Sequence, residues 1–129
     1  MTDRVLTIRP YKQEDALELL TDHKEKAWAK VNEAYGPGVT YELDDKVIAC
    51  AGIRTFGMGE IWAVFGEGAK ELKLTLCKES KRQVREMMEK MGLWLVIATV
   101  DEKTSQTQRD FLEFLGFVKT ECYTYRKDL

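Results

Sequence analysis

Two short runs, which are apolar apart from Thr99 in the second, constrain the fold of this chain most strongly. They cover residues 61–65 and 93–100, and neither alternates apolar with polar side chains as a half-exposed strand does. Such runs are typical of strands covered on both faces, so we expect residues 61–65 to be central in a sheet. Between them lies the longest helical stripe, whose members are Leu76, Ser80, Val84, Met87, Met88 and Met91. Residues 72–76 also alternate like a strand, so the pattern places the start of this helix anywhere from Lys70 to Thr75.

The remaining elements follow from similar patterns. An alternating strand ends at Pro10, two short helices precede the break at Gly36, and a hairpin turns at Asp44 and Asp45. A helix over residues 104–115 ends at Gly116, and the last strand or strands lie within residues 117–125. The predicted order is β-α-α-β-β-β-α-β-α-β. A length of 129 residues predicts a single domain over residues 1–129.

The balance of charge excludes some classes of partner. Twenty basic and twenty-two acidic residues give a formal net charge of −2, which disfavours a protein that neutralises a nucleic-acid backbone. No apolar run approaches the roughly 18 to 20 residues that span a bilayer, and the first residues lack the pattern of a signal peptide. We therefore expect a soluble, cytoplasmic protein with no membrane partner.

Cysteine and histidine form no metal-binding pattern. Cys50, Cys77 and Cys122 lie far apart, no CxxC pair occurs, and His23 is the only histidine. Cys50 lies in an apolar run and is expected to be a small buried side chain instead of a nucleophile. His23 is expected on the surface near a helix end. We predict no metal site and no disulfide framework.

Motifs at the two ends of the chain resemble those of a known family. Ile8, Arg9 and Pro10 close the first strand, and an aromatic-rich stretch from residue 111 ends in Leu-Gly-Phe at residues 115–117. With the length and the element order, these motifs resemble the GNAT acyltransferase fold over nearly the whole chain. The resemblance implies an α/β (α+β) fold with a mixed, mostly antiparallel central sheet flanked by helices. Residues 60–69 are most similar to the small GNAT-like proteins of tailed phages, some of which are virion or assembly proteins without an assigned reaction.

The resemblance also implies a co-substrate. In GNAT enzymes, acetyl-CoA lies in a V-shaped opening between the strands that correspond to residues 61–65 and 93–100, with its pantetheine pairing like an extra strand. Glycines at the following helix N-terminus would allow close approach of the pyrophosphate. The implied binding residues for acetyl-CoA or another acyl-CoA are Ala63, Val64, Phe65, Gly66, Gly68, Ala69, Lys70 and Lys73. Basic residues of the helix, namely Lys73, Lys78, Lys81 and Arg82, could help to hold the 3'-phosphate. The alternative is an ordinary turn followed by a solvated helix face.

Two features depart from the family pattern. The loop after Phe65 lacks the usual Arg or Gln followed by Gly-x-Gly, and it carries Glu67 where an anion would bind. Leu112 stands where the family usually has the tyrosine that protonates the leaving CoA thiolate. Tyr123 or Tyr125 on the final strand could supply that proton instead. Alternatively, these two aromatics pack on the sheet or at a homodimer contact.

The other implied roles concern the amine acceptor. Glu60, just before the central strand, is a candidate base for the amine, directly or through water, and the alternative is a solvated carboxylate at the start of a strand. Trp28, Tyr35 and Tyr41 are candidates for lining the acceptor site. Nothing in the sequence identifies the acceptor, which could be a small molecule or a protein.

Two functions remain in competition. The first is an acyl-CoA-dependent N-acyltransferase that moves an acetyl group to a primary amine by direct attack. The second is a non-catalytic GNAT-fold phage protein that acts in virion assembly or binds a host protein, in the host cytoplasm or the virion. The loop and Leu112 favour the second, whereas the glycines and the basic helix favour the first, which we expect.

Overall fold

The described residues form one seven-stranded sheet with helices on both of its faces. A computed structural model describes residues 5–55, 59–100, 105–119 and 124–128. The elements in chain order are β1 Leu6–Pro10, α1 Gln13–Leu19, α2 His23–Ala34, β2 Gly38–Leu43, β3 Lys46–Thr55, β4 Gly59–Phe65, the 3₁₀ helix η1 Glu67–Leu72, α3 Lys73–Met91, β5 Leu95–Thr99, α4 Gln106–Phe114, β6 Val118–Lys119 and β7 Thr124–Asp128. This order confirms the predicted one, with η1 added.

The sheet is mixed and mostly antiparallel, as predicted. Its strand order is β1-β2-β3-β4-β5-β7-β6, and β4–β5 is its parallel junction in the described part of the chain. That junction consists of two residue pairs, Gly59 with Val96 and Glu60 with Ile97. Residues 61–65 of β4 pair with β3 along one edge and have no described strand along the other. The sheet is therefore divided beyond Glu60.

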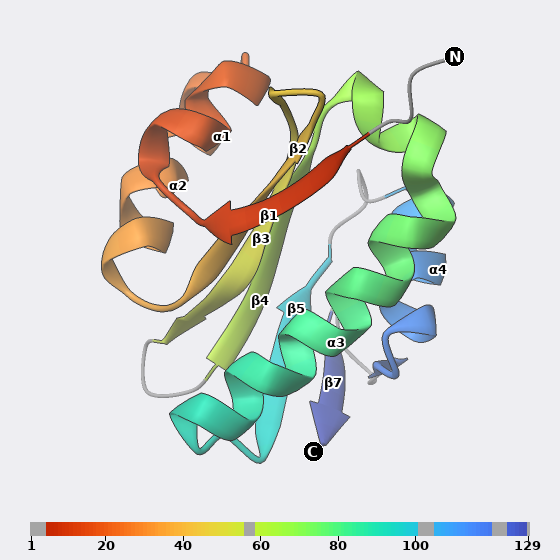
Figure 1. Cartoon of the computed structure of the whole chain (residues 1–129). Helices are drawn as coiled ribbons and strands as arrows, with labels where there is room; N and C mark the ends of the chain where they lie inside the picture. Colours follow the sequence, from red (N-terminus) through yellow and green to blue (C-terminus); the bar gives the residue numbers. More distant parts are fainter. Residues whose placement is uncertain (1–4, 56–58, 101–104, 120–123, 129) are drawn as a thin grey trace.

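Helices cover the sheet from both sides. Figure 1 shows α1 and α2 on one face, and α3 with α4 on the other. Five of the six residues in the predicted stripe of α3 are buried, Met91 is partly buried, and Met88 is fully covered. Among the described helices, none has both the length and the apolar character that a membrane span requires.

The indole of Trp62 explains two glycines on the α1–α2 face. A methyl group at Gly38 would lie 3.0 Å from the Cζ2 atom of Trp62, and one at Gly52 would lie 2.9 Å from it. The ring of Tyr11 meets the indole edge-on, with centroids 4.6 Å apart. The large aromatic side chain can lie across the sheet because both positions lack a side chain.

The turns agree with the sequence pattern. Asp44 and Asp45 have positive φ angles of 52° and 67°, as a two-residue hairpin turn requires. α3 begins at Lys73, inside the predicted window, and ends at Gly92, whose φ is 69°.

The two apolar strands are less covered than predicted. On β4, Ala63 and Phe65 are exposed, and Trp94 before β5 has 70% of its surface exposed. The expectation of cover on both faces was wrong for the second half of β4, because β5 leaves it there and a cavity takes the place of a neighbouring strand.

Candidate functional site

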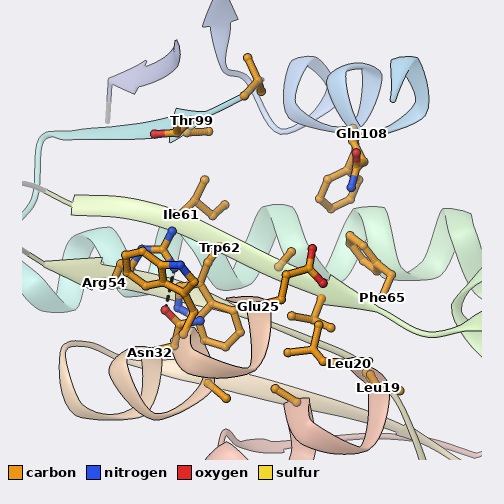
Figure 2. A pocket seen from close by; sticks show the side chains of 18 of the residues that line it. Leu19, Leu20, Glu25, Asn32, Arg54, Ile61, Trp62, Phe65, Thr99 and Gln108 are labelled. Atoms are coloured by element: carbon orange, nitrogen blue, oxygen red, sulfur yellow. Dashed lines mark hydrogen bonds between the residues drawn. The ribbon is translucent and has the colours of Figure 1, made fainter. Parts of the chain in front are cut away.

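A cavity of about 480 Å³ opens where β4 and β5 part. Its walls come from residues 61–65 of β4, residues 98–100 at the end of β5, the helices α1 and α2, and one face of α4. Figure 2 shows these side chains converging on a common space. The predicted opening between the two apolar runs is therefore present.

One face of α2 forms a wall of this cavity. Glu25, Trp28, Ala29 and Asn32 all line it, and their spacing of three, four and seven residues places them on one helical face. Trp28 was a candidate acceptor-site residue, and 46% of its surface is exposed at this wall.

A network of charged and polar groups lies at the closed end of the opening. Oε1 of Glu60 accepts a hydrogen bond of 2.6 Å from Nε of Arg54, and Oε2 accepts one of 2.7 Å from Oγ1 of Thr99. Nη1 of Arg54 donates to Oδ1 of Asn32 at 2.7 Å, and its guanidinium stands 4.3 Å from the centre of the Trp28 ring. Figure 2 shows Arg54, Asn32 and Thr99 of this network beside the cavity.

Glu60 therefore connects three neighbouring strands. Arg54 lies on β3, Glu60 on β4 and Thr99 on β5, next to the last β4–β5 residue pair. The side chain of Glu60 is 22% exposed, so it is a partly buried, ion-paired carboxylate at the start of a strand instead of a freely solvated one. Its role as a base stays a prediction, although both carboxylate oxygens are already engaged.

An aromatic contact spans the opening. The rings of Phe65 at the end of β4 and Phe111 on α4 meet edge-on, with centroids 5.5 Å apart. Leu112, which stands at the family's usual tyrosine position, also lines the cavity. This side of the opening is therefore mainly apolar, with Gln108 of α4 as a polar member of its lining.

The glycines after β4 point into the protein. A methyl group at Gly66 would lie 2.7 Å from Cδ2 of Leu19, and one at Gly68 would lie 2.6 Å from Cγ2 of Ile48. The N–H of Gly66 donates to the carbonyl oxygen of Ile48 at 2.7 Å. These glycines let the loop pack closely on β3 and α1, so the lack of a side chain at Gly66 and Gly68 has a packing reason that does not depend on a pyrophosphate.

The implied acyl-CoA residues fall into two groups. Ala63, Val64 and Phe65 line the cavity, and they lie on the edge of β4 that has no described partner strand. Gly66, Gly68, Ala69 and Lys73 lie outside the lining, and the side chain of Lys70 lies outside the described part of the structure. η1 precedes α3, so the dipole of the long helix begins at Lys73 and not at Gly66. The edge of β4 thus leaves main-chain groups without a described partner strand, and the glycines that follow it lie at the start of η1 instead of the long helix α3. Binding of an acyl-CoA by these residues stays a prediction.

The remaining candidate residues occupy varied places. Tyr41 is buried, and its hydroxyl lies 3.3 Å from that of Ser80, so its expected place at the acceptor site was wrong. Tyr35 is half exposed and lies outside the cavity lining. Tyr125 on β7 pairs through its backbone with Ala98 of β5, and Tyr123 lies outside the described residues.

The cysteine and histidine expectations are confirmed where the structure describes them. Cys50 is fully buried, and burial raises the pKa of its thiol to about 12. Cys77 is also buried, and burial raises the pKa of its thiol above the ordinary value. His23 is exposed at the first position of α2. Cys122 lies outside the described residues.

Sequence reasoning missed Glu25, Asn32 and Arg54. Glu25 and Asn32 lie three residues before and four residues after Trp28, so they share its helical face. Taking that spacing from Trp28 would have placed both on the same wall of the cavity.

The fold is shared with solved acetyltransferases. Comparison of the sequence with protein-family models and with curated proteins gives no match. A GNAT-family acetyltransferase from Staphylococcus aureus Mu50 is similar in structure with a TM-score of 0.75 at 13% identity, over 97% of this chain and 99% of that one. An acetyltransferase from Streptococcus agalactiae 2603 gives 0.74 at 12% identity, over 96% and 98% of the two chains. IAA acetyltransferase from Bacillus cereus ATCC 14579 gives 0.72 at 13% identity, over 97% and 100%. The chain thus has a GNAT-like α+β fold, as the end motifs implied.

Proposed function

We propose that this chain is an acyl-CoA-dependent N-acyltransferase that moves an acetyl group to a primary amine. The observation that carries the proposal is the early end of the β4–β5 pairing, because the cavity opens directly beyond the Glu60–Ile97 pair. A gap inside a sheet leaves backbone N–H and C=O groups of one strand edge free to bind an extended ligand.

The free edge of β4 over residues 61–65 would hold the thioester arm of the acyl-CoA, by main-chain hydrogen bonds of the kind that an added strand makes. Acyl-CoA supplies an acyl carbon bonded to a good leaving group. In the transfer, the amine nitrogen forms a bond to that carbon and the carbon–sulfur bond breaks. The nitrogen loses one proton and the departing thiolate gains one, so the products are an amide and a free thiol.

The proton for the thiolate requires a donor other than the residue at position 112, which is a leucine. We assign this role to Tyr123 or Tyr125. The supporting observation is that β7, which carries Tyr125, pairs with β5, and the end of β5 lines the cavity.

A second candidate function is binding without catalysis, in the manner of a phage-type GNAT-fold protein. Three observations favour it: the aromatic contact between Phe65 and Phe111 across the opening, the inward direction of Gly66 and Gly68, and the leucine at position 112. Under this proposal the fold serves as a scaffold in virion assembly or in binding a host protein.

Two measurements separate these functions. Under the first, acetyl-CoA at 100 times its dissociation constant raises the stability by about 2.7 kcal/mol, which a thermal melt detects. Mixing acetyl-CoA with a panel of primary amines then releases free thiol, and mass spectrometry detects the amide. If millimolar acetyl-CoA causes no thermal shift and no amine causes release of thiol, the transferase proposal fails and binding without catalysis is the function that stays.

A further inference from the structure

One carboxylate that faces the cavity has no partner in the described part of the chain. Glu25 lies in the first turn of α2, and Figure 2 shows its carboxylate pointing into the cavity. The other acidic groups nearby are engaged: Glu60 accepts from Arg54 and Thr99, and Glu33 accepts from the backbone N–H of Gln13. Glu25 is therefore the acidic group available to a ligand.

The charges of the lining leave a net negative value. Its charged members are Glu25 and Arg54. The charge of Arg54 is balanced by Glu60, whose carboxylate oxygen lies 2.6 Å from its Nε atom. Among the described residues, no ion pair balances the charge of Glu25, so their charges make this part of the cavity favourable for a cation.

The surface around Glu25 suits an aliphatic body. Leu19, Leu20, Ala29 and Val64 line the cavity around it, and all four side chains are apolar. Trp28, one helical turn away, has 46% of its surface exposed and adds hydrophobic area, although the guanidinium of Arg54 already stands over its ring. An alkyl chain that ends in an ammonium group would meet this apolar surface and the carboxylate of Glu25.

A nitrogen held by Glu25 is not the reacting one. A neighbouring carboxylate stabilises the protonated form of an amine, and a protonated amine has no free electron pair with which to attack a thioester. The reacting nitrogen must therefore belong to a second amino group, farther along the same molecule and closer to the edge of β4.

We propose that the acceptor is an aliphatic diamine or a longer polyamine, and that Glu25 binds its non-reacting ammonium group. The transfer part of this inference rests on the proposed function, whereas the binding part does not. Glu25 acts as a specificity-determining residue, since it selects acceptors that carry a second positive charge.

The test uses three probes of matched length: 1,5-diaminopentane, 1-aminopentane and 5-aminopentanoate. Calorimetry at low ionic strength should show the diamine binding about three- to tenfold more tightly than the monoamine, because exposed ion pairs are weak. The aminopentanoate should bind most weakly. Added salt should reduce the advantage of the diamine, because it screens an exposed pair.

The substitution Glu25→Gln should make the diamine and the monoamine bind equally. Glu18→Gln is the matched control, because Glu18 is exposed on α1 and lies outside the lining. In an acetyl-transfer assay, Glu25→Gln should raise KM for the diamine by the same factor and leave kcat unchanged. Equal binding of the diamine and the monoamine to the unmodified chain, or an unchanged preference in Glu25→Gln, would overturn the inference.

The two proposals fail in different ways. Diamine binding that depends on Glu25, without transfer to any amine, would sink the transferase and support the cation site. Acetyl transfer at equal rates to amines with and without a second positive charge would support the transferase and sink the cation site.

Discussion

Replacing Glu60 by glutamine tests whether this side chain holds strands together or removes a proton. The amide keeps the size of the carboxylate, and its oxygen can still accept the hydrogen bond from Arg54. Its NH₂ group would face the hydroxyl of Thr99, which can rotate and accept. The substitution therefore removes the negative charge and keeps the shape.

The cost follows from the surroundings of the pair. The side chains of Arg54 and Glu60 are only 15% and 22% exposed, so loss of one charge leaves the other largely buried and unbalanced. Such a loss lies between the values for exposed pairs and for fully buried pairs, at about 2 kcal/mol. With unfolding entropies near 2.1 cal/mol/K per residue over 129 residues, Tm should fall by about 7 °C.

Thr99→Val serves as the control. It removes the second hydrogen bond to Glu60 and keeps both charges, so we expect a loss of only about 1 kcal/mol. Thermal unfolding of the two variants should rank them in that order.

Turnover gives the second measurement. If Glu60 holds strands, Glu60→Gln should retain most of its turnover per folded molecule, with the same dependence on pH. If Glu60 is the base, turnover should fall by about 10² to 10⁴. A Tm within about 2 °C of the original, together with a loss of turnover of that size, would refute the structural role.

Three further outcomes follow from the packing. Gly68→Val should lower stability by about 1 to 3 kcal/mol in a denaturant titration, because its Cβ would lie 2.6 Å from Cγ2 of Ile48. Unchanged stability would mean that the loop is not held against β3. Burial by itself would raise the pKa of Asp15, but the bidentate ion pair with Arg9 and two further hydrogen bonds outweigh it and hold the pKa below the ordinary value. Stability should therefore be lost as the pH falls from about 4 through this lower pKa, and Asp15→Asn should flatten that dependence; equal acid sensitivity of both chains would contradict it. Cys50, with its thiol pKa raised to about 12 by burial, should resist iodoacetamide at pH 8 until the chain is unfolded, as peptide mass spectrometry would show.

Much of the fold could be predicted because its signals are local. Alternation, helical periodicity and turn residues gave the element order, and the turn at Asp44 and Asp45 required only two neighbouring residues. The parting of β4 and β5 was implied by the end motifs alone. No pattern within either strand states where its pairing stops.

Fewer contacts of the candidate site could be predicted from the sequence, because many of them depend on tertiary packing. Arg54 and Glu60 are directly paired on the antiparallel strands β3 and β4, so their contact could have been inferred by pairing these two runs, which are close in sequence. The contact of Glu60 with Thr99 could not, because it depends on strands that meet 39 residues apart in sequence. The direction of Gly68 also depends on tertiary packing, since composition predicts a turn but not which side of it meets Ile48.

The free edge of β4 bears on whether the protein aggregates by pairing with strands of other molecules. An unpaired strand edge on the outside of a sheet is a template for another protein's strand, and natural sheets protect such edges against aggregation. Here the unpaired edge lies inside the sheet, and the cavity beside it is walled by α1 and α2 on one side and by α4 on the other. A narrow, flexible molecule can reach these backbone groups, whereas a strand of a folded neighbour, with side chains on both faces, would collide with the helices. The same helices that form the cavity walls thus protect the unpaired edge of β4 from pairing with strands of other molecules.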